Sequence, residues 1–134
     1  RYKSPFLPRS DRRRALSHQK LKSEPPLLNS EQRHSIERAI NEVCDHRRWQ
    51  MHVINVRTNH VHVVVSIGHV DPTRALNAFK AYSTRRMRRD GNWTESHSPW
   101  ADRGSQRYLW NERSLARAID YVRNGQGDEL PDFD

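Results

Sequence analysis

Two histidines separated by one residue stand inside a valine-rich segment, HVHVVVSI, at positions 60–67. The alternation of a β-strand places His60 and His62 on one face, about 7 Å apart along the backbone, while the valines fill a core behind them. Two imidazoles in this arrangement can converge on one divalent metal ion. The alternative is a pair of histidines on a solvated sheet face, and an H-x-H pattern alone does not decide between the two.

A tyrosine near the end of the sequence could act with these histidines. Leu115, Ala118, Ile119 and Val122 recur at helical spacing, and Tyr121 falls on the flank of this apolar stripe. Its hydroxyl could therefore reach an adjacent sheet face. Two sheet histidines, a metal and a tyrosine supply the groups for cutting a phosphodiester, because the metal polarises a phosphoryl oxygen and the tyrosine oxygen attacks phosphorus.

The elements that must position these residues follow from hydrophobic periodicity and capping signals. We expect a helix from Asn29 or Ser30 to about Arg47, a hairpin of two strands, a helix from Asp71 and Pro72 to the DGN sequence, a short strand, and a helix between Asn111 and Gly125. The hairpin strands are expected at 49–56 and 60–67 and the short strand at 105–110, after a polar loop at 93–104. This order predicts an α+β sandwich with helices on an antiparallel sheet.

The length of 134 residues predicts one domain. We assign residues 29–126 to it. Residues 1–28 form a basic, proline-containing segment whose only periodic stretch is a short helix around 11–21, and residues 127–134 form an acidic tail.

The composition points to a polyanion as partner. There are 24 Lys and Arg against 16 Asp and Glu, a formal net charge of +8, and much of the excess is arginine, which suits phosphate contacts. Cys44 is the only cysteine, which excludes an intramolecular disulfide and a multi-cysteine zinc site. The sequence contains no apolar run of about 20 residues and no apolar leader, so we expect a cytoplasmic, nucleoid-associated protein without a membrane partner.

Three segments of the sequence, taken in order, resemble those of a known family. The order NHVHVVVS, LNAFKAYSTRRMRR, YLWNERSLARAIDYVRNGQG is similar to that of the single-tyrosine HUH transposases of bacterial insertion sequences, and especially to their relatives associated with repetitive extragenic palindromes. The resemblance extends from about Pro25 to Gln126. It implies a ferredoxin-like sandwich, with His60 and His62 as metal ligands and Tyr121 as the nucleophile.

The resemblance also implies the remaining parts of the site. The family's third metal ligand is a Gln or Asn about one helical turn after the tyrosine; here Gln126 is preferred, provided that Gly125 breaks the helix, and Asn124 is the second choice. The implied activity is that of an endonuclease and strand transferase on single-stranded DNA at hairpins, through a covalent 5′-phosphotyrosine. The expected cofactor is Mg²⁺ or Mn²⁺, and the expected assembly is a homodimer.

Two further expectations concern the sheet and the DNA. Members of the family begin with a strand that enters the centre of the sheet, but RYKSPFLPRSDRRR offers no such strand, so we expect either a fragment or an incomplete sheet.

Net charge and resemblance together favour DNA-backbone contacts by basic side chains. The residues chosen are Arg57, Lys80, Arg85, Arg86 and Arg107.

Several alternatives stay open. Tyr82 is a rival nucleophile, although a packing or DNA-facing role suits it better, and Tyr108 is expected to be a sheet aromatic. His52 shares a face with His60 only in one hairpin register. The rival functions are a non-catalytic DNA-binding regulator of the same fold and a basic RNA-binding domain with incidental histidines.

Overall fold

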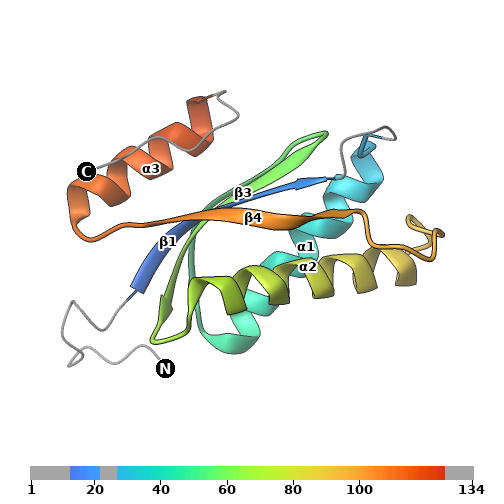
Figure 1. The fold of residues 1–134 in the computed structure, drawn as a ribbon, viewed down its shortest axis with the longest axis horizontal. Coiled ribbons are helices and arrows are strands. Elements are labelled where there is room, and N and C mark those ends of the chain that lie inside the picture. Colours follow the sequence, from blue (N-terminus) through green and yellow to red (C-terminus); the bar gives the residue numbers. More distant parts are fainter. Residues whose placement is uncertain (1–12, 22–26, 126–134) are drawn as a thin grey trace.

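A computed structural model describes residues 13–21 and 27–125. These residues form a four-stranded antiparallel sheet with α1 and α2 on one face and α3 on the opposite face (Figure 1). The elements in chain order are β1 (Arg13–Leu21), α1 (Ser30–Arg47), β2 (Gln50–Val56), β3 (His60–Gly68), α2 (Pro72–Arg89), β4 (Trp100–Tyr108) and α3 (Glu112–Asn124). Among the described residues, no helix has the length and apolar composition needed to cross a membrane.

The first strand is present, which corrects the expectation of an incomplete sheet. β1 occupies residues that were expected to be helical, and it lies between β3 and β4 in the strand order β2-β3-β1-β4. It runs antiparallel to both neighbours. The order β1-α1-β2-β3-α2-β4 is that of a ferredoxin-like fold, so the predicted fold class is confirmed. The sheet therefore extends into the predicted N-terminal segment 1–28, whereas the predicted tail at 127–134 lies outside the described residues.

The sheet separates two apolar clusters, one on each face. Val61, Val63 and Val65 of β3 pack with Ile40 of α1 and Phe79 of α2. On the other face, Val64 and Leu16 pack against the apolar side of α3. Because alternate residues of a strand point to opposite faces, the histidines of β3 belong to the α3 face.

Each helix begins at a capping residue that the sequence predicted. Asn29 caps α1 with a capping box in which its side chain and that of Gln32 bond each other's backbone N–H groups. Asp71 caps α2, and Asn111 caps α3 by accepting from the Ser114 N–H at 2.8 Å. Gly125 follows the last residue of α3, as expected.

The predicted hairpin is confirmed, whereas the last strand is longer than predicted. β2 and β3 form the expected antiparallel hairpin, and β3 is central as its valine run predicted. β4 begins at Trp100, before the predicted start at residue 105. The end of the predicted loop at 93–104 is therefore strand.

Candidate metal centre

Three buried histidines meet on the α3 face of the sheet. His60 and His62 come from β3, and His18 comes from β1, where it is the direct cross-strand partner of His62. One ring nitrogen from each imidazole lies within 4.8 Å of those of the other two. The rings of His18 and His62 are stacked with centroids 4.5 Å apart, and the His60 ring lies edge-on to both. Three imidazoles at these separations could hold one divalent metal ion.

A neighbouring side chain orients His60. Its Nδ1 lies 2.7 Å from Oδ1 of Asn59. When the ring proton is on Nδ1, His60 donates to this amide oxygen and keeps the lone pair of Nε2 available for a metal. A hydrogen bond to the second ring nitrogen is the usual way in which proteins fix the orientation of a metal-binding histidine.

Burial keeps His62 neutral. Loss of hydration, with further contributions from the neighbouring His18, His60 and Arg57, lowers the pKa of His62 to about 3. Its Nε2 is buried and has no hydrogen-bond partner among the described residues. A buried polar atom without a partner costs free energy, which a metal at that nitrogen would relieve. The neutral, buried donor set therefore fits a metal ion.

Tyr121 lies beside this cluster. It is half-buried on α3, and its ring meets the His62 ring edge-on with centroids 5.7 Å apart. The apolar side of α3 packs on the sheet, and Nδ2 of Asn55 donates to the carbonyl oxygen of Val122 at 3.0 Å. Because Asn55 is also the cross-strand partner of His62, β2 ties the C-terminal turn of α3 to the histidines.

Of the two amide residues expected to complete the site, Asn124 is the one that the structure describes, and it lies outside the site. Asn124 is exposed, and its Nδ2 donates to Oδ1 of Asp120 at 2.8 Å, on the outer side of the helix. Gly125 ends α3 in an extended conformation, which is the helix break that the choice of Gln126 required. Gln126 itself lies outside the described residues.

Sequence reasoning missed His18. The signal available was its place in ALSHQKL, where Leu16, His18 and Lys20 alternate with the residues that face α1 and α2, but the segment was expected to be helical. His52, the histidine that was considered as a third ligand, bonds Oγ of Ser66 at 2.8 Å, toward the far end of the hairpin from His60.

The five basic residues chosen as DNA contacts have different environments. Arg57 is half-buried and adjoins the histidines, and Arg107 is exposed on β4, opposite Leu16 of β1. Lys80 donates to the carbonyl oxygen of Ala101 at 3.4 Å. The exposed Arg85 lies over the Tyr82 ring.

Arg86 differs from the others. It is only 8% exposed, and NH1 bonds both carboxylate oxygens of Glu42 at 2.8 Å while Nε bonds Asp90. The bond from NH1 to Glu42 joins α2 to α1, so Arg86 has a structural role and its charge is neutralised within the protein.

The rival tyrosines lie away from the histidines. Tyr82 is on α2, the layer on the other face of the sheet. Tyr108 is 41% exposed and stacks on Trp110, with ring centroids 5.0 Å apart. Only Tyr121 has a ring contact with the histidine cluster among the tyrosines that the structure describes.

Comparison with known proteins agrees with this fold. Residues 20–124 match the family model described as transposase, IS200 like. No curated protein matches the sequence. One similar solved structure is that of a REP-associated tyrosine transposase bound to a REP hairpin, with 15% identity and a TM-score of 0.66 over 91% of this chain and 69% of that chain. A second is a candidate transposase from Deinococcus radiodurans, with 13% identity and a TM-score of 0.63 over 93% of this chain and 97% of that one.

Proposed function

This chain belongs to the IS200-like transposase family, and we propose that it is a metal-dependent endonuclease and strand transferase that acts on single-stranded DNA at hairpins. The observation that carries the proposal is the edge-on contact between the Tyr121 ring and His62 within a cluster of three buried histidines. A nucleophile and a metal-binding set next to each other are the two requirements of tyrosine-dependent phosphodiester cleavage.

The metal would be held by His60, His62 and His18, with Gln126 as the proposed fourth ligand. Mg²⁺ and Mn²⁺ are the candidate ions, and a set of three imidazoles favours Mn²⁺ of the two, because Mg²⁺ prefers oxygen ligands. When bound, such an ion supplies Lewis-acid polarisation of a phosphoryl oxygen.

The covalent step belongs to Tyr121. Its hydroxyl oxygen forms a bond to phosphorus, the bond between phosphorus and the 3′ oxygen breaks, and the phenol proton ends on that oxygen as a free 3′-hydroxyl. The reverse step transfers the 5′-phosphate from Tyr121 to another 3′-hydroxyl. No nucleotide cofactor is needed, because the phosphotyrosine conserves the phosphodiester bond. His62 stays neutral near pH 7 and so does not oppose a metal ion by its own charge.

Basic residues around the site would hold the DNA. We expect Arg57 beside the histidines and Arg107 on β4 to contact the strand that is cut, whereas Lys80 and Arg85 lie on the opposite layer. The similar tyrosine transposase is bound to a REP hairpin, which supports hairpin DNA as the partner. A homodimer is proposed as well: β2 and β4 are the edge strands of the described sheet, and an open edge can pair with a second copy.

The covalent intermediate gives a direct test. A labelled single-stranded hairpin incubated with the protein and Mn²⁺ is expected to leave a protein–DNA adduct that survives boiling in detergent. Tyr121→Phe should abolish the adduct, and Tyr108→Phe, the matched control on β4, should retain it. Hairpin binding by the folded native protein without any adduct would overturn the proposal and favour a non-catalytic DNA-binding protein of the same fold.

A further inference from the structure

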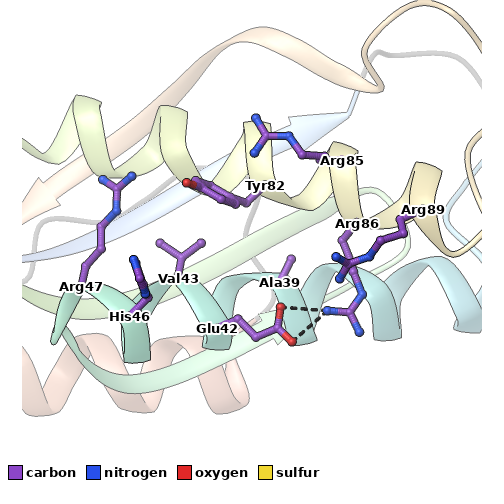
Figure 2. Close-up of a pocket in the computed structure, with 9 residues that line it drawn as sticks. All are labelled: Ala39, Glu42, Val43, His46, Arg47, Tyr82, Arg85, Arg86 and Arg89. Carbon is purple, nitrogen blue, oxygen red and sulfur yellow. Dashed lines mark hydrogen bonds and ion pairs between the residues drawn. The ribbon is translucent and has the colours of Figure 1, made fainter.

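A groove runs between α1 and α2, on the layer opposite the histidines (Figure 2). It encloses about 530 Å³, and one wall comes from each helix. The lining residues are Ala39, Glu42, Val43, His46 and Arg47 of α1 and Tyr82, Arg85, Arg86 and Arg89 of α2. The proposed cleavage mechanism uses none of these side chains for its chemistry.

The groove carries excess positive charge. Arg86 is neutralised by Glu42 and Asp90. Arg47, Arg85 and Arg89 have no carboxylate within 4 Å among the residues that the structure describes. Glu42 is the one acidic side chain in the lining, and both of its oxygens are bonded to Arg86. The remaining arginines therefore leave a positive potential that favours an anion.

Tyr82 brings two of these arginines together. The guanidinium of Arg47 lies 5.8 Å from the centre of the Tyr82 ring, and that of Arg85 lies 4.8 Å from it (Figure 2). The pKa of Tyr82 is lowered, chiefly by a hydrogen bond with Arg47 and also by Arg85, so both cations act on one phenol. Two like charges gathered from different helices around one hydroxyl form a site that an oxyanion would stabilise.

We propose that Arg47, Tyr82 and Arg85 form a phosphate-binding site for the backbone of double-stranded DNA, on the face of the sheet opposite the histidine cluster. The identity of the ligand as DNA rests on the proposed function. Single-strand binders offer free aromatic faces on which bases stack, but both cations already occupy positions over the Tyr82 ring. The site therefore contacts phosphates and does not read sequence.

The chain offers a matched set of variants. Arg85→Gln and Arg47→Gln each remove one groove charge, and Arg74→Gln removes one charge from an exposed residue of α2 outside the groove. Binding is measured by fluorescence anisotropy with a blunt duplex of arbitrary sequence over a range of NaCl concentrations. Each groove variant should bind about tenfold more weakly and lower the slope of log K against log[NaCl] by about one, as expected for the loss of one phosphate contact. Arg74→Gln should keep the native slope.

Three results would overturn the proposal. The first is equal affinity and slope for Arg85→Gln, Arg47→Gln and Arg74→Gln in proteins that melt like the native chain. The second is displacement of the duplex by inorganic phosphate beyond the effect of NaCl at equal ionic strength, which would assign the groove to a free anion. The third is a groove-dependent preference for a single strand over the duplex.

The test of the groove can fail or succeed independently of the test of the cleavage mechanism. Tyr121→Phe should bind the duplex as the native protein does, because Tyr121 lies on the other face of the sheet. If the native protein forms no adduct but the groove variants still lose duplex binding, the cleavage mechanism fails and the groove stands. If the adduct forms and the groove variants bind the duplex normally, the proposed cleavage mechanism is supported and the proposed phosphate-binding site is wrong.

Discussion

Gly125 lies directly against Tyr121. Its N–H donates to the Tyr121 carbonyl oxygen at 2.6 Å, and a Cβ at position 125 would lie 2.6 Å from Cδ1 of the Tyr121 ring and 2.6 Å from that oxygen. The φ of Gly125 is −80°, which any residue can adopt, so the requirement for glycine comes from space and not from backbone conformation. Glycine at this position lets the phenol ring fold over the end of α3, next to His62.

We therefore expect Gly125→Ala to displace the Tyr121 ring. A misplacement of about 1 Å can lower a reaction rate by about 100-fold, so the rate of adduct formation should fall by up to that factor. Mn²⁺ should still bind, as measured by calorimetry, because three of the four proposed ligands, His18, His60 and His62, are on the sheet. Arg123→Ala, an exposed change on the same helix, serves as the control. A native rate in Gly125→Ala would mean that the position of the ring does not limit cleavage.

Asn59 should contribute to metal affinity without touching the metal. It holds His60 through Nδ1, and loss of such a hydrogen bond typically lowers metal affinity by about 10- to 100-fold. Asn59→Ala should show this loss in a Mn²⁺ titration. Thr58→Ala, an exposed neighbour in the same turn, should not. Equal affinities for the two variants would contradict an orienting role for Asn59.

The sequence predicted the parts of the site that lie on strongly patterned elements. The valines around His60 and His62 gave the strand, its central place and the shared face of the histidines, and the stripe from Leu115 to Val122 gave the position of Tyr121 on α3. The stripe arises because one side of α3 is buried, and the valine run arises because β3 is buried on both faces, so hydropathy reports both patterns directly.

β1 carried no such pattern, and this hid the third histidine. Ser17, His18 and Gln19 are all buried in the centre of the sheet, where apolar residues are usual. Nε2 of Gln19 donates to the carbonyl oxygen of Ala101, which belongs to a strand far along the chain. Partners of that kind are set by tertiary structure, so hydropathy could not distinguish this buried strand from a polar surface segment.

The low pKa of His62 predicts a pH dependence of stability in the metal-free protein. The folded state has a pKa of about 3 and the unfolded chain one near 6.5. Between these values the unfolded state binds more protons, so the free energy of unfolding should rise with pH across this window, with a slope of at most about 1.4 kcal/mol per pH unit from this group. Urea denaturation in EDTA at several pH values within that window measures it. His62→Gln should flatten the dependence, and an unchanged slope in that variant would assign the effect to other groups.

Asn111 should stabilise the helix that carries Tyr121. Its side-chain oxygen accepts from the Ser114 N–H at 2.8 Å and from the Ser114 hydroxyl at 2.9 Å, at the start of α3. Removing an N-cap of this type costs about 1 kcal/mol, so Asn111→Ala should lower the free energy of unfolding by about that amount in urea. Asn111→Asp keeps an accepting oxygen and adds a negative charge at the helix N-terminus, so it should remain near native stability. If the alanine and aspartate variants unfold at the same urea concentration, packing of Leu115 and Val122 on the sheet alone holds α3 in place, and the cap contributes nothing to the position of the phenol.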